Sequence, residues 1–260
     1  MMKQIFTLFK KEFKSMFFSP LFYVIAFLTT VLLGITFSIS ILNFANQISN
    51  AMMAMGLGST QQQNIHYVVF LPHLSLLNLI LMFMVPALAM RLISEEKKNR
   101  TFDLLLTSPI SSVQIVVGKY LSLLAVVLGL SLIAFIYMLV ARKMFEFAWA
   151  PALLALTGMF LVGAVYSALS MFASSLTENT MIAFFVGIVF NISVWILGGF
   201  AELVESTTMK AVFDQISLNQ HLQSLVEGVL RLNGVVFFAS VIFLFCFLTE
   251  RVVESARWRS

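Results

Sequence analysis

The stretch "LFYVIAFLTTVLLGITFSISILNF" (residues 21–44) carries no charged side chain, and no charge occurs anywhere between Lys14 and Arg91. A charge at the centre of a bilayer costs about 2.5–3.5 kcal/mol on the insertion scale, so uncharged windows mark where helices can cross a membrane. One crossing needs about 20 residues. This window is therefore long enough for two spans, and the polar, glycine-containing residues 46–64 separate them.

The composition of the whole chain also indicates a membrane protein. Of the 260 residues, 60% are hydrophobic and 11% are charged, and the mean hydropathy is +0.97. A soluble domain carries about 25% charged residues, so this chain lacks the polar side chains to cover a water-facing surface. Cys246 is the only cysteine, which excludes an internal disulfide. We expect an all-α polytopic membrane protein that forms one transmembrane domain over residues 1–260.

The remaining uncharged windows set the number of spans. The fifth is separated from the fourth only by "SSLTEN" (174–179). We expect six transmembrane helices, at approximately residues 21–44, 67–91, 113–141, 150–173, 179–200 and 234–250. An even number of spans places both termini on the same side of the membrane.

Lysine and arginine are distributed unevenly between the two sides. Twelve lie in the N-terminal segment, the loop between spans two and three, and the C-terminal tail, whereas four lie on the opposite side. The positive-inside rule makes the side with twelve cytoplasmic. The Arg142–Lys143 pair argues against this placement but does not reverse the bias. Both termini are therefore expected in the cytoplasm.

The segment before the first span has an amphipathic pattern. Its apolar residues recur every four positions, at Ile5, Phe9, Phe13 and Phe17, and its lysines lie elsewhere on the helical wheel. This pattern is typical of a helix that lies in the headgroup plane. We expect an interfacial helix over residues 1–20; a basic flank that only orients span one is the alternative. The side chains assigned to this helix are Phe9, Lys10, Lys11, Phe13 and Lys14.

The charged stretch "RLISEEKKNRTFDLLLTSPISS" (91–112) lies between spans two and three. Thr101 can cap a helix, and Asp103 falls in its first turn, where a negative charge suits the helix dipole. Pro109 disfavours helical backbone at the residue before it and so ends the helix. We expect a helix of one to two turns over residues 101–107, on the cytoplasmic side.

Three consecutive leucines, residues 104–106, give this short helix an apolar surface. Water does not favour such a surface, so something should cover it. Either the leucines fold back onto the protein's own interfacial surface or a partner protein covers them, and composition alone does not decide between the two. The following "SSVQ" (111–114) provides a capping box for span three.

Residues 202–233, between spans five and six, are too many for a simple turn. Apolar side chains share one helical stripe at Leu218, Leu222, Leu225 and Val229. We expect outer-face helices here, the last of them ended by Asn233-Gly234. The helices either dip partly into the outer leaflet or form a solvated hairpin.

No motif for catalysis is present. The G-x-x-x-x-G-K-[ST] phosphate loop is missing, and the pair Gly118-Lys119 carries no weight as a phosphate site. The three histidines are scattered, and packing explains the methionines better than copper binding does. We therefore predict no catalytic, cofactor-binding or metal-binding residue. The net charge of +4 is modest and does not indicate a nucleic-acid partner.

The span interiors lack acidic and basic residues, which argues against an ion-driven carrier. They do contain mildly polar residues: Asn78, Ser131, Ser167, Ser170, Asn191 and Ser193. Such residues more often bridge helices than bind solutes.

Three motifs carry a resemblance to a known family: "KKEFKSMFFSPLFYV" (10–24), "RLISEEKKNRTFDLLLTSPISSVQIVVGKYL" (91–121) and "HLQSLVEGVLRLNGVVFF" (221–238). Together they resemble the permease subunit of type-2 ABC transporters, and within it the gliding-motility-associated permeases. The second motif is the most specific, with an acidic pair, a Thr-x-acidic-Leu-Leu core, a proline and a Gly-Lys. The family often has a glycine where this chain has Arg100 and an acidic residue where it has Asn233.

The resemblance implies that the short helix at 101–107 is a coupling helix, which docks in a groove of a separate ABC ATPase subunit. The residues assigned to this coupling are Glu95, Glu96, Arg100, Thr101, Phe102, Asp103, Leu104, Leu105, Leu106 and Pro109. ATP and Mg²⁺ would bind to the ATPase, so the chain itself is expected to be neither an enzyme nor a cofactor-binding protein.

The resemblance also implies a second permease copy or a sister permease, an auxiliary extracytoplasmic protein, and a place in the bacterial inner membrane. Three functions remain open. The chain is the membrane subunit of an ATP-driven exporter, an ABC-coupled mechanical or assembly component that acts on an envelope partner, or an uncoupled scaffold.

Overall fold

The computed structural model describes residues 2–54, 65–102, 105, 107, 110–203 and 207–257. The described residues contain no strand, and six of their helices are long and apolar enough to cross a membrane. The prediction of an all-α protein with six spans is confirmed.

The six spanning helices are α2 (Pro20–Ala54), α3 (Leu71–Ala89), α6 (Ser112–Met144), α7 (Trp149–Leu176), α8 (Thr180–Leu203) and α11 (Leu232–Arg257). The shorter elements are α1 (Met2–Phe17), the π-helices η2 (His66–Phe70) and η3 (Arg91–Glu95), α4 (Glu96–Lys98), α9 (Thr207–Ile216) and α10 (Leu218–Val226). We expected residues 46–64 to interrupt the helix, but α2 continues to Ala54. Residues 46–54 contain neither proline nor glycine, so nothing stops the helix before the rest of that segment, which lies outside the described residues.

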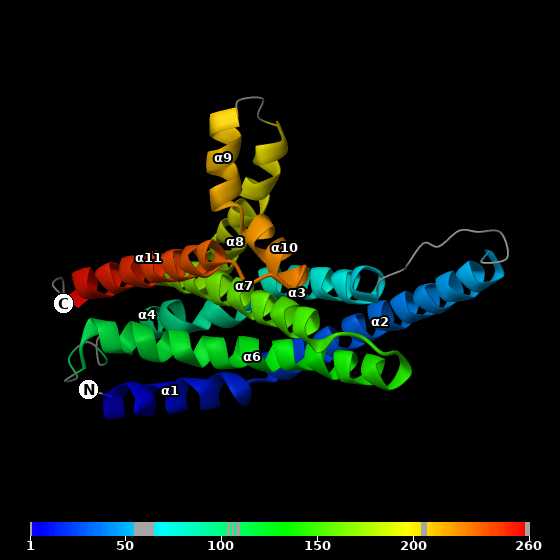
Figure 1. Cartoon of the computed structure of the whole chain (residues 1–260). Helices are drawn as coiled ribbons and strands as arrows, with labels where there is room; N and C mark the ends of the chain where they lie inside the picture. The colour runs from blue at the N-terminus through cyan, green and yellow to red at the C-terminus, as the bar shows by residue number, and fades with distance from the viewer. Residues whose placement is uncertain are drawn as a thin grey trace.

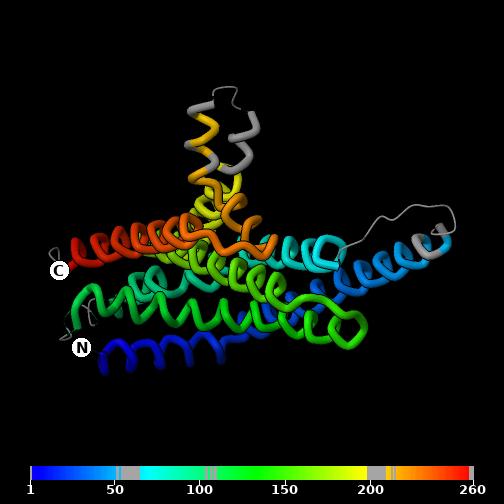
Figure 2. The backbone as a smooth tube through the Cα atoms, in the orientation of Figure 1, coloured from blue at the N-terminus to red at the C-terminus, as the bar shows by residue number. Residues whose placement is uncertain are grey.

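Helix α7 is at the centre of the bundle and packs against α3, α6, α8, α10 and α11 (Figure 1). In its most apolar window 67% of the residues are buried, against 17% for α8 and α11. Gly163 lets α7 approach α6 closely, because a Cβ there would lie 2.5 Å from Val127 Cγ1. The backbone trace in Figure 2 shows α1 alongside the first half of α6, with both helices starting at the same end of the bundle.

Several polar side chains within the spans bridge helices, as predicted. The Tyr166 hydroxyl of α7 donates to Asn78 Oδ1 of α3 at 3.0 Å. The Asn191 amide of α8 donates to the Met82 carbonyl at 3.1 Å and lies 3.4 Å from Ser170 Oγ. The other three, Ser131, Ser167 and Ser193, donate to carbonyls of their own helices.

Helix α10 packs against the N-terminal half of α7. Its Leu222 and Leu225 lie so close to Gly158 that a Cβ there would be within about 3.1 Å of either side chain. The expected end of this helix at Asn233-Gly234 is wrong, because both residues lie in the first turn of α11. The helix ends instead before Gly228, whose φ of +83° is the left-handed conformation that ends a helix. Val229 is therefore outside the helix and not on its apolar stripe.

Candidate functional site

The connection from span two to the predicted coupling segment is a π-helix, η3, rather than a continued α-helix. The Ser174 hydroxyl of α7 donates to the Met90 carbonyl at 3.1 Å. The same oxygen accepts from the backbone N–H groups of Ile93 (3.3 Å) and Ser94 (3.1 Å). Ser174 thus supplies hydrogen-bond partners to backbone groups at the point where the α-helix changes to a π-helix. π-helical turns are frequent at functional sites. We call η3, which connects span two to the predicted coupling segment, the hinge.

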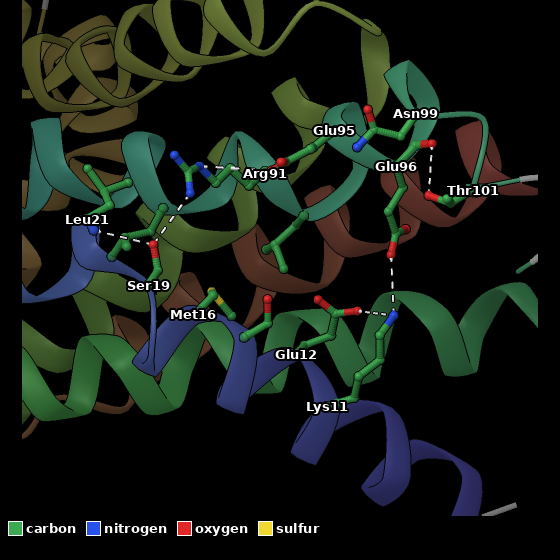
Figure 3. A pocket seen from close by; sticks show the side chains of 13 residues that line it. Lys11, Glu12, Met16, Ser19, Leu21, Arg91, Glu95, Glu96, Asn99 and Thr101 are labelled. Atoms are coloured by element: carbon green, nitrogen blue, oxygen red, sulfur yellow. Dashed lines mark hydrogen bonds and ion pairs between the residues drawn. The ribbon is translucent and has the colours of Figure 1, made fainter.

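A buried lysine lies beside this hinge. Lys119 of α6 is fully buried, and its ammonium nitrogen is 2.8 Å from Glu96 Oε1 and 3.2 Å from Glu12 Oε1. The third contact, at 2.6 Å, is with the Leu92 carbonyl. The three donors of the ammonium group therefore have three acceptors, as a buried charge requires. Lys11 makes longer contacts with the same two carboxylates, 3.4 Å to Glu12 and 3.9 Å to Glu96 (Figure 3).

We call Glu12, Leu92, Glu96 and Lys119 the Lys119 cluster. It joins α1, η3, α4 and α6 at one point. Next to it, Gly118 lets α1 sit directly against α6, since a Cβ there would lie 3.0 Å from Leu8 Cδ2. At the start of α6 the Ser112 hydroxyl donates to Glu254 of α11. The elements around the hinge are thus tied together by ion pairs and close packing.

Two of the described residues in the predicted coupling segment are helical. Phe102 and Leu105 have helical backbone, and the Leu105 N–H donates to the Thr101 carbonyl at 3.3 Å. Phe102 is 3% exposed, and Lys97 Nζ lies 5.6 Å from its ring centroid, so this ring anchors the segment to the protein. Leu105 is partly buried and lines a groove with Leu8 of α1. The assigned residues Asp103, Leu104, Leu106 and Pro109 lie outside the described residues.

Two further assigned residues lie at the surface. Glu95 is half-exposed, and its Oε2 is 3.9 Å from Nε of Arg91. Arg100 is exposed and has a φ of 55°. This left-handed conformation costs a non-glycine residue about 1–3 kcal/mol. It gives a physical reason for the glycine that the resembling permeases often have at this position.

The buried side of α1 differs from the predicted one. The buried residues are Leu8, Glu12 and Met16, whereas Phe9 and Phe13 are partly buried and stack on each other at 5.8 Å. The assigned Lys10, Lys11 and Lys14 are exposed. The sequence analysis did not assign a face to Glu12, which its contact with Lys119 holds on the buried side. The interfacial position of this helix stays a prediction.

Sequence reasoning missed Glu12, Lys119 and Ser174. Lys119 was discounted because no phosphate-binding glycine loop precedes it, and its partner Glu12 is 107 positions away. One signal was available: Glu12 and Lys119 each lie in one of the motifs that carry the family resemblance. The capping box at Ser111–Gln114 was predicted and is confirmed, with hydrogen bonds of 3.3 and 3.0 Å.

Residues 43–249 match the family described as ABC-2 family transporter protein. The chain belongs to this family. The match covers most of the chain, from the outer half of span one to the end of span six, and includes Glu96, Lys119 and Ser174 but not Glu12. Comparison with curated proteins finds no match.

Membership makes the chain a multi-pass membrane component of an ABC transporter, a type-2 permease, and not its catalytic domain. Permeases of this family work in general with an ABC ATPase. Among the described residues, no group of three or more histidine, cysteine or acidic side chains could hold a metal ion.

Proposed function

We propose that this permease couples ATP hydrolysis by a separate ABC ATPase subunit to export across the bacterial inner membrane. The coupling segment, residues 101–107, docks on the ATPase from the cytoplasmic side, where both termini also lie. The observation that carries the proposal is the helical backbone at Phe102 and Leu105, with the buried ring of Phe102 as its anchor. ATP and Mg²⁺ bind to the ATPase, and a second permease copy or a sister permease completes the pore.

The contacts around the hinge explain how ATPase movement reaches the spans. An unbroken α-helix from span two would connect the coupling segment rigidly to that span, but η3 interrupts such a connection. The Lys119 cluster and Ser174 replace it, because they tie η3 and α4 to α1, α6 and α7. Movement of the segment is then shared by these helices as one rigid body.

Docking is tested with Leu104→Asp. We expect this variant to insert normally and to lose co-purification with the ATPase, since a carboxylate does not enter an apolar groove without a partner. Leu230→Asp is the matched control, because Leu230 is exposed at the outer end. Retention of the ATPase by Leu104→Asp, or its loss from both variants, contradicts docking at this segment.

A second function, mechanical work on an envelope protein as in the gliding-motility group, has one observation in its favour. Helix α7 contacts the hinge through Ser174 at its inner end and α10 through Gly158 at its outer end. Movement of the hinge can therefore reach an outer surface, where an auxiliary extracytoplasmic protein would bind. Stimulation of the ATPase by a transported amphiphile in proteoliposomes favours export. Coupled ATPase activity that responds only to the extracytoplasmic protein favours mechanical work.

A further inference from the structure

A cleft of about 370 Å³ lies between α1 and the hinge. In Figure 3 the side chains of Lys11 and Glu12 on α1 lie opposite those of Arg91 and Glu95 on η3 and Glu96 on α4. The lining is mixed, because Leu21 and Leu88 of the two spans line the same cleft as these charged side chains. A ligand that fits this lining has both charged and apolar parts.

The cleft lies at the cytoplasmic boundary of the membrane. The uncharged stretch that contains spans one and two begins after Lys14 and ends before Arg91. Leu21 and Leu88 line the cleft. Leu21 lies in the first turn of span one, and Leu88 lies in the last turn of span two. The headgroups of cytoplasmic-leaflet lipids are at this level, so a lipid is the amphiphile that can reach the cleft.

The charges of the lining favour a zwitterion. Two cations, Lys11 and Arg91, and three carboxylates, Glu12, Glu95 and Glu96, line the cleft, and Lys119 beneath it supplies the third positive charge. The three positive and three negative charges balance, so neither a net anion nor a net cation is favoured over a ligand that carries both signs.

Parts of this lining are incompletely hydrogen-bonded. The Arg91 guanidinium lies 3.4 Å from Ser19 Oγ and 3.9 Å from Glu95 Oε2, both longer than a strong charge-assisted bond. The carboxylate of Glu95 is half-exposed, so it can accept further hydrogen bonds from a ligand in the cleft. A primary ammonium group offers three donors for such bonds.

We propose that the cleft binds the headgroup of phosphatidylethanolamine from the cytoplasmic leaflet. Arg91 and Lys11 contact the phosphate, and Glu95 accepts from the ammonium group. The glycerol and acyl chains lie beside Leu21 and Leu88. Phosphatidylcholine has the same net charge but no N–H donor, and phosphatidylglycerol has no cationic group.

Native mass spectrometry of the full chain in mild detergent tests this assignment. With matched acyl chains, we expect phosphatidylethanolamine to bind about tenfold more tightly than phosphatidylcholine, because only the former can donate a hydrogen bond to Glu95. This comparison uses the unaltered protein, so folding of a variant does not enter. Equal retention of the two lipids overturns the proposal.

Variants locate the site. Arg91→Gln and Glu95→Gln alter half-exposed side chains and should each weaken phosphatidylethanolamine binding about tenfold. Lys14→Gln is the control, since Lys14 is exposed on α1 and does not line the cleft. If Lys14→Gln weakens phosphatidylethanolamine binding equally, the lipid is held by general surface charge, and the assignment to this cleft is overturned. Displacement of the lipid by free phosphoethanolamine at equal concentration overturns the assignment to a lipid.

Discussion

At the scale of single residues, Lys119 has the most demanding environment in the described structure. A fully buried ammonium is stable only while its acceptors remain in place. Hydropathy treats this lysine as the end of a cytoplasmic loop, and its burial depends on Glu12 and Glu96 arriving from two other helices. Contacts between residues so far apart in the chain leave no local sequence pattern, so the burial of Lys119 could not be predicted from the sequence. Arg100 is a different case, because its left-handed backbone lies at the position where the sequence departs from the glycine frequent in the resembling family.

Replacement of Lys119 by methionine should destabilise the protein by about 3–5 kcal/mol, because Glu12 and Glu96 would remain buried without their main partner. Neutralising the whole group, with Glu12→Gln and Glu96→Gln added, should recover most of this loss. Thermal unfolding of the detergent-purified chain, followed by size-exclusion chromatography, measures both effects. Lys98→Met is the matched control at an exposed position. A single Lys119 variant as stable as this control would show that the cluster contributes nothing.

At the scale of elements, the number and class of the helices followed from the sequence, whereas their ends followed only in part. The capping box of α6 was predictable because both of its hydrogen bonds lie within four residues. The end of α10 was not, since Gly228 and Gly234 are both plausible stops, and it is Gly228 that has the left-handed backbone, next to Pro151. The π-helical form of η3 depends on Ser174, about 80 residues away, so local propensity gives no sign of it.

Ser174→Ala should loosen this hinge without unfolding the bundle. It leaves the amides of Ile93 and Ser94 without their acceptor, at a cost of about 1–3 kcal/mol. Hydrogen–deuterium exchange of peptides covering residues 90–98 should therefore become faster. Ser175→Ala is the control, because that hydroxyl bonds only to the Phe172 carbonyl of its own helix. Equal exchange in the two variants would remove Ser174 from the hinge.

At the scale of the whole molecule, both proposals require that the hinge face the cytoplasm. The bias of twelve basic residues to four supports this orientation. Of the opposing pair, Arg142 has local partners, since it donates to the Phe147 carbonyl at 3.2 Å and lies 5.8 Å from that ring. These contacts hold the guanidinium in the turn between α6 and α7.

Labelling with a membrane-impermeant maleimide tests the orientation directly. With Cys246→Ala as background, we expect Lys10→Cys and Lys98→Cys to be protected in intact cells with a permeabilised outer membrane and to react after lysis. Lys210→Cys, in α9, should react in both cases; all three lysines are exposed, so burial does not explain a difference. If Lys210→Cys is protected while the other two react in intact cells, the molecule is inverted. The coupling segment then faces away from any ATPase, and the lipid cleft opens to the outer leaflet.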